Sequence, residues 1–116
     1  MSVKHYKELI VWQKSMDLVV LIYAITKQLP KDELYGLSSQ MRRAAISIPS
    51  NIAEGSERGT SKDFAQFLRI ADGSSSELET QLLICERLFP NIDTMASRAL
   101  IDEIQRMLDG LMKSIR

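Results

Sequence analysis

Cysteine and histidine are almost absent from this sequence, which contains one of each, Cys85 and His5. A lone cysteine cannot form an intramolecular disulfide. The only histidine is expected to be a solvated residue of the N-terminal lead, so a histidine-dependent catalytic triad cannot be built around a core serine. The paired Glu-x-x-His sequences that carboxylate-bridged metal sites in helical bundles require are also missing. We therefore expect no metal and no histidine-based catalysis.

Glycine and proline are sparse, with five and three residues. Gly55 and Gly59 lie between two expected helices with no strand before them, so they predict a turn rather than a phosphate-binding loop, and no cofactor is expected. Glu77 and Glu79 are two residues apart and point away from each other on a helix, which does not favour acid-base catalysis. Cys85 is expected to act as a small buried hydrophobe.

Neither an excess of one charge nor a long apolar run is present. Lys plus Arg and Asp plus Glu each total 15, so an anionic partner would have to meet a local patch. The longest apolar run, residues 18–25, spans about 12 Å as helix, against the ~30 Å of a bilayer core. No membrane span is expected. Residues 1–5 lack the features of a secretory signal, and the chain has a single thiol, so the cytoplasm is the expected location.

The segments that remain have a helical apolar rhythm, and 45% of the residues are hydrophobic. Breaks at Pro30 to Asp32, Gly55 to Gly59 and Pro90-Asn91 separate four helices, expected at about residues 7–28, 34–54, 61–89 and 93–115. The fold class predicted is all-α: one domain of residues 1–116, folded as an antiparallel up-down-up-down four-helix bundle, with a kink where Pro49 interrupts the second helix.

Each expected helix has an apolar stripe that we assign to the core. The stripes are Leu9, Trp12, Met16, Val19, Val20 and Tyr23 in the first helix; Leu37, Met41, Ala44, Ala45, Ile48 and Ile52 in the second; Phe64, Phe67, Leu68, Ala71, Ser75, Leu78, Leu82 and Cys85 in the third; and Leu100, Ile104, Met107, Leu108, Leu111 and Ile115 in the fourth.

The first helix is apolar on its other side as well. Leu18, Leu21, Ile22 and Ile25, followed by Leu29, project from the face opposite Met16 and Tyr23. A helix that is apolar all round has to be buried on both sides, and covering such a ridge contributes several kcal/mol at ~25 cal/mol per Å². These residues therefore predict the interface of a homo-oligomer.

Polar residues follow one line beside the apolar stripe of the second helix: Gln40, Arg43, Ser47, Asn51 and Glu54. Together with Glu77 of the third helix, this polar stripe either forms a ligand site or fixes the register of neighbouring helices or subunits, and the structural interpretation is favoured.

Basic side chains could form a patch for a nucleic acid or another partner. The candidates are Arg42, Arg43, Arg58, Lys62 and Arg69. Asp72 and Glu79 lie near them, and aromatic platforms for bases are scarce, so a solvated surface with salt bridges is the alternative.

Six short segments form a recognisable combination: residues 9–14 (LIVWQK), 40–45 (QMRRAA), 48–55 (IPSNIAEG), 67–71 (FLRIA), 73–74 (GS) and 77–79 (ELE). With these segments the chain resembles a bacterial family of four-helix-bundle proteins encoded in intervening sequences of 23S ribosomal RNA genes. The resemblance implies an antiparallel bundle that assembles as a ring of five subunits. The family is similar to a strongly basic accessory protein of diversity-generating retroelements, which binds nucleic acid and the reverse transcriptase. This chain has no net positive charge, so the similarity gives weaker support to nucleic-acid binding by this chain. The family's marked positions, Asn51, Glu54, Arg69, Gly73, Ser74 and Glu77, bring no catalytic role.

The function predicted is that of a non-catalytic, pentameric accessory or adaptor protein whose partner is RNA, DNA or a nucleic-acid-processing protein. The alternative is a protein interaction scaffold with no role in nucleic-acid binding. A remote alternative is an enzyme with a site between subunits, where Arg43, Glu54 and Glu77 would converge.

Overall fold

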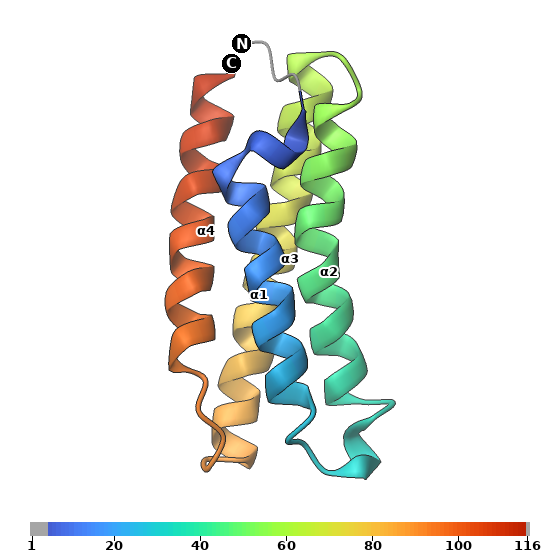
Figure 1. The fold of residues 1–116 in the computed structure, drawn as a ribbon, viewed down its shortest axis with the longest axis vertical. Helices are drawn as coiled ribbons and strands as arrows, with labels where there is room; N and C mark the ends of the chain where they lie inside the picture. The colour runs from blue at the N-terminus through green and yellow to red at the C-terminus, as the bar shows by residue number, and fades with distance from the viewer. Residues whose placement is uncertain (1–4, 116) are drawn as a thin grey trace.

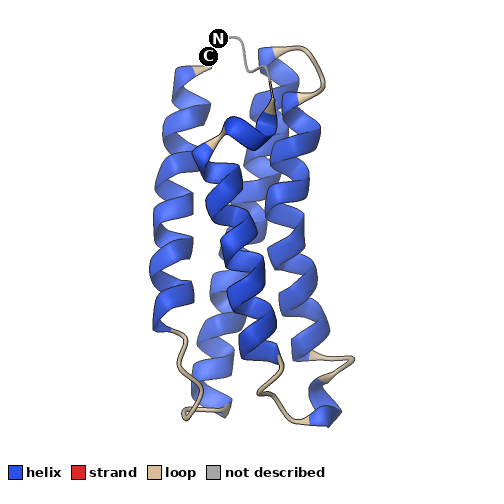
Figure 2. Ribbon diagram, viewed as in Figure 1, coloured by secondary structure: helices blue, strands red, loops and turns tan. Residues whose placement is uncertain are grey.

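The computed structural model describes residues 5–115, which contain four α-helices and no strand (Figures 1 and 2). The helices are α1 (Ile10–Thr26), α2 (Leu37–Ser56), α3 (Ser61–Leu88) and α4 (Met95–Ser114), and short 3-10 turns occupy Tyr6–Glu8 and Lys31–Glu33. The prediction of an all-α fold is confirmed. None of these helices is long and apolar enough to cross a bilayer. Residues 1–4, which entered the argument about location, lie outside the described part of the chain.

The four helices lie side by side along one axis, and the molecule measures 44 × 23 × 19 Å. The α1–α2 and α3–α4 connections lie at one end of the bundle, and the α2–α3 turn lies at the other end (Figure 1). Each helix packs on its neighbours in the chain, and α4 also packs on α1. The helices therefore enclose one common core.

Local hydrogen bonds explain where α2 and α3 begin. The side chain of Glu33 accepts a hydrogen bond from the backbone N–H of Leu37 at 3.3 Å, so α2 starts three residues later than predicted. Thr60 accepts a hydrogen bond from the N–H of Asp63 at 3.1 Å and so caps the start of α3. Gly59 in the preceding turn has φ of +90°, a backbone conformation that favours glycine.

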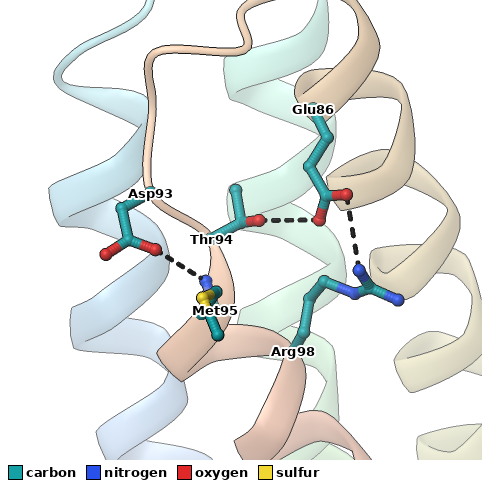
Figure 3. Close-up of polar contacts among 5 residues, drawn as sticks. All are labelled: Glu86, Asp93, Thr94, Met95 and Arg98. Carbon is teal, nitrogen blue, oxygen red and sulfur yellow. Dashed lines mark hydrogen bonds and ion pairs between the residues drawn. The ribbon is translucent and has the colours of Figure 1, made fainter.

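A polar cluster at the α3–α4 connection fixes the start of α4 (Figure 3). Asp93 accepts a hydrogen bond from the N–H of Met95 at 3.0 Å, and the Thr94 hydroxyl donates to Glu86 of α3 at 2.6 Å. Arg98 lies 3.4 Å from the other carboxylate oxygen of Glu86. These contacts attach the first turn of α4 to the last turns of α3.

The predicted core stripes of α2, α3 and α4 are largely confirmed. Their buried members are Met41, Ala44, Ala45, Ile48 and Ile52; Phe64, Leu68, Ala71, Ser75, Leu78, Leu82 and Cys85; and Ile104, Leu108 and Ile115. Ile101 of α4 is also fully buried, although the prediction did not include it. The buried apolar residues form one continuous cluster.

The prediction for α1 is wrong in part. Leu9, Trp12 and Val19 of the predicted core stripe are half-buried against the core. However, Leu18 and Ile22 are fully buried and Ile25 is 4% exposed, so these three residues, predicted to form the oligomer interface with Leu21, belong to the interior of the subunit, while Leu21 is half-buried. Met16 and Val20, predicted to lie in the core, are 43% and 69% exposed.

The physical reason for this orientation is the shape of the side chains. The inward face of α1 presents aliphatic residues and two small polar residues, Ser15 and Thr26. The Ser15 hydroxyl donates to the Val11 carbonyl at 2.6 Å. The bulky Trp12 and Tyr23 are half-buried at the border with α2, where large aromatic groups with a polar atom retain access to solvent. Ser15 is satisfied locally and does not oppose burial of this face.

Candidate functional site

A polar groove runs between α2 and α3. It is lined by Gln40, Arg43, Ala44 and Ser47 from α2 and by Ser74 and Glu77 from α3, and its volume is about 360 Å³. Gln40, Arg43, Ser47 and Glu77 belong to the polar stripe predicted from sequence, so the structure brings these four residues together. We refer to this site as the α2–α3 groove.

The floor of the α2–α3 groove is held by short polar contacts. The hydroxyls of Ser47 and Ser74 lie 2.8 Å apart, and the Asn51 side chain donates to the Ser47 hydroxyl at 2.9 Å and to the Ser47 carbonyl at 2.7 Å. Pro49 is buried inside α2 and has no N–H to donate to the Ala45 carbonyl. The Asn51 amide bonds to Ser47 and not to that free carbonyl. Its contacts support the structural interpretation of this part of the stripe.

The two charged residues of the groove have opposite signs and are not paired. Neither Arg43 nor Glu77 forms a hydrogen bond or an ion pair through its side chain within residues 5–115, although both line the same groove. Both side chains are exposed. The groove therefore presents one free cation and one free anion at its rim.

Glu54, the last member of the predicted stripe, lies outside this groove. Its carboxylate pairs with Arg58 at 2.6 Å, and the guanidinium of Arg58 lies 4.9 Å from the centre of the Phe67 ring. These contacts connect the end of α2 to α3. The suggested convergence of Glu54 with Arg43 and Glu77 is not seen within the subunit.

The five basic residues proposed as a contact patch are distributed over several places. Arg42 faces α1, because its Nε donates to the Thr26 hydroxyl at 2.8 Å and its guanidinium lies 4.5 Å from the centre of the Tyr23 ring. Arg43 faces α3, and Arg58 is held by Glu54. Lys62 and Arg69 are exposed and two turns apart on α3.

A second groove, between α1 and α2, is apolar and was missed by sequence reasoning. Trp12, Met16 and Val19 of α1 face Ile46, Pro49, Ser50 and Ala53 of α2, with Tyr6 at one end, and the volume is about 310 Å³. The signal that could have revealed it is Ile46, a large apolar residue outside the core stripe of α2, which is 42% exposed. We refer to this site as the α1–α2 groove.

The remaining candidates for chemistry are placed apart. Burial, and then the negative charge of Glu86, raise the pKa of the Cys85 thiol, which disfavours the reactive thiolate. His5 is exposed and accepts a hydrogen bond from the Lys7 N–H at 3.2 Å. Within residues 5–115 no group of three or more His, Cys, Asp or Glu side chains is arranged to hold a metal ion.

One carboxylate between α3 and α4 has a perturbed pKa. Burial, and then repulsion by Asp109 of α4, raise the pKa of Asp72 above 3.8. Above its folded-state pKa, Asp72 is charged and destabilises the fold. As the pH falls from the folded-state pKa towards 3.8, Asp72 becomes protonated in the folded state before it does so in the unfolded state. The destabilisation is therefore lost over this pH range.

We expect Asp72→Asn to be more stable than the parent protein at pH 7, with a difference that shrinks at acid pH. Urea unfolding followed by circular dichroism at pH 7 and pH 4 measures this, with Asp17→Asn, at an exposed position of α1, as the matched control. A variant less stable than the parent at pH 7 contradicts the prediction.

Comparison with known protein families shows the family to which the chain belongs. A family profile described as 23S rRNA-intervening sequence protein matches residues 7–110, which is most of the chain. None of the curated proteins compared with the chain matches it. The matched region contains all of α1, α2 and α3, the whole α2–α3 groove, and the α1–α2 groove except Tyr6.

Proposed function

The chain belongs to the 23S rRNA-intervening sequence protein family, and from this premise we propose that it is a non-catalytic adaptor that self-assembles and holds a partner protein. In this proposal the subunit is an antiparallel up-down-up-down bundle bent at Pro49, and the assembly is the ring of five that the resemblance implies. The observation that carries the proposal is the apolar α1–α2 groove.

The α1–α2 groove has the composition of a protein interface. None of its eight lining residues is charged, and they include Trp12, Tyr6 and Met16, types that are enriched in the centres of interfaces. Val20, 69% exposed, adds to the apolar surface of α1. Covering a few such side chains contributes several kcal/mol, since full burial of one is worth about 1.5–3 kcal/mol. A second copy of this chain is the occupant that we propose.

We expect Val20→Asp to convert the assembly to monomer, because an unpaired carboxylate in an apolar interface costs about 3–5 kcal/mol, or at least a hundredfold in the dissociation constant. Sedimentation velocity at micromolar concentration measures the mass. Val20 does not line the groove itself but follows the lining residue Val19 on the outward side of α1. The matched control is Ile84→Asp, which places the same charge at a residue that is 43% exposed on α3, a helix that does not line this groove.

Either of two outcomes would contradict self-assembly through the outward apolar face of α1, which carries Val20 and one wall of the α1–α2 groove. The first is a parent protein that is monomeric at these concentrations. The second is a folded Val20→Asp variant, verified by circular dichroism, whose mass equals that of the parent.

The partner is proposed to be a protein because the basic residues are dispersed. Arg42 and Arg58 are engaged within the bundle, and tight binding to nucleic acid depends on several cations that neutralise phosphates together. Nucleic acid is the second candidate, and Lys62 and Arg69, exposed on the same face of α3, favour it. A salt-dependent gel shift with structured RNA that is lost on replacing these two residues would reassign the partner.

A further inference from the structure

We propose that the α2–α3 groove is the docking site for one helix of a partner protein, with acidic side chains on one flank of that helix and basic side chains on the other. The inference rests on the proposed adaptor function and assigns the adaptor's partner site to a surface separate from the one used for self-assembly. Three features of the groove carry it: its unpaired charges, its shape and one unsatisfied buried amide.

The unpaired charges lie opposite each other across the groove. Ser47 of α2 touches Ser74 of α3, and a Cβ built on Gly55 would lie 2.6 Å from the Cβ of Phe67, so residue numbers rise along α2 while they fall along α3. The same register places Arg43 level with Glu77. A helix lying in the groove would place one flank against Arg43 and the other against Glu77. Its acidic flank would face α2 and its basic flank would face α3.

The shape of the groove suits a helix better than a small molecule. Its floor is made of Ala44, Ser47 and Ser74, whose short side chains allow close approach. Gln40 and Ser47 mark its length, because seven residues of helix span about 10 Å, or two turns of a partner helix. Exposed ion pairs contribute little individually, so a small ligand that makes only two of them would bind weakly. A helix adds buried area along the whole groove.

A buried amide oxygen without a partner among the described residues lies level with the Gln40 end of the groove, on a residue of α3 that does not itself line the groove. Gln81 of α3 is 5% exposed, and its Oε1 has no hydrogen-bond partner within residues 5–115. The register places Gln81 opposite Gln40, one turn of α3 beyond Glu77. A buried acceptor without a donor costs free energy, and the basic flank of a docked helix is rich in N–H donors. A rotation of the Gln81 amide towards the groove would bring donor and acceptor together.

The test uses a designed peptide on the full-length protein. The probe is a 21-residue alanine-based helix, acetylated and amidated, with glutamates along one flank and arginines along the other. The control peptide has the same composition with both residue types mixed on each flank. In ¹⁵N–¹H correlation spectra we expect the probe to shift the backbone amides of residues 40–47 and 74–77, and the control peptide to bind about fivefold more weakly.

Charge reversal provides the decisive comparison. Arg43→Glu and Glu77→Arg are each expected to weaken binding of the probe about fivefold, since each makes both rims of the groove alike in charge. The double variant R43E/E77R restores opposite charges, and the probe regains its affinity by lying in the reverse direction. Shifts that lie outside the groove, single variants with unchanged affinity, or a double variant that regains nothing would each overturn the proposal.

This experiment and the test of self-assembly fail independently. The groove residues do not line the α1–α2 groove, so R43E and E77R should leave the sedimentation mass unchanged. The titration is repeated on Val20→Asp, where docking of the probe should persist. If the parent protein is monomeric and still binds the probe, only the proposal of self-assembly is contradicted. If the parent protein assembles and does not bind the probe, only the proposed docking site is contradicted.

Discussion

Leu18→Ala is expected to lower the free energy of unfolding by about 2–5 kcal/mol, whereas Val20→Ala, half a turn away on the same helix, should change it by less than about 0.5 kcal/mol. Leu18 is fully buried, so its truncation removes apolar contacts and leaves a cavity between the helices, while Val20 is 69% exposed. Urea unfolding followed by far-ultraviolet circular dichroism measures both variants. Several protein concentrations separate subunit stability from any contribution of self-assembly.

The pair of variants tests the orientation of α1 directly. An assignment of Met16 and Val20 to the core predicts the opposite order of effects. Equal losses for the two variants, or a larger loss for Val20→Ala, would contradict the structure. The slope of the unfolding free energy against urea should stay the same for both, since neither change alters the surface exposed on unfolding by much.

Gly55→Ala is expected to destabilise the fold by about 1–3 kcal/mol, although alanine is the better helix former by about 1 kcal/mol. A Cβ at this position would lie 2.6 Å from the Cβ of Phe67 and 3.1 Å from the Cδ1 of Phe64. The Cβ of Phe67 is attached to the backbone and cannot swing away, so α2 and α3 would have to separate. Gly55 is therefore a point of close contact between these helices.

Gly110→Ala on α4 is the matched control. No atom lies within 4 Å of a Cβ built there, so the same substitution should stabilise the protein by up to about 1 kcal/mol through helix propensity alone. Thermal unfolding of both variants gives the comparison. A Gly55→Ala variant that is stabilised like Gly110→Ala would show that the two helices are not in close contact.

The number and type of the elements could be predicted because turn residues and apolar rhythm agree along most of the chain. The helix breaks at Gly59 and Pro90 depend only on local backbone chemistry. The core stripes of α2, α3 and α4 could be predicted because each of these helices has one main apolar stripe, and the apolar residues outside it are few. The line of Gln40, Ser47 and Asn51 on one side of α2 follows from helical spacing alone.

The orientation of α1 could not be predicted from its pattern, because two of its sides are apolar and periodicity does not rank them. Packing decides between them: the compact aliphatic side chains of Leu18 and Ile22 fill the space between α2 and α4, and Trp12 and Tyr23 are left at the border with α2. This choice also decides which apolar residues face outwards and line the α1–α2 groove.

The sequence by itself determined the four helices, their breaks and the inward faces of three of them, because these depend on contacts within a few residues or on a single apolar stripe. Only the tertiary structure decided which helices meet along each line. That arrangement brought Arg43 level with Glu77 and placed Met16 beside Ile46. Such pairs are far apart in the chain, and the free energy that joins them comes from filling one shared core, which no local pattern contains.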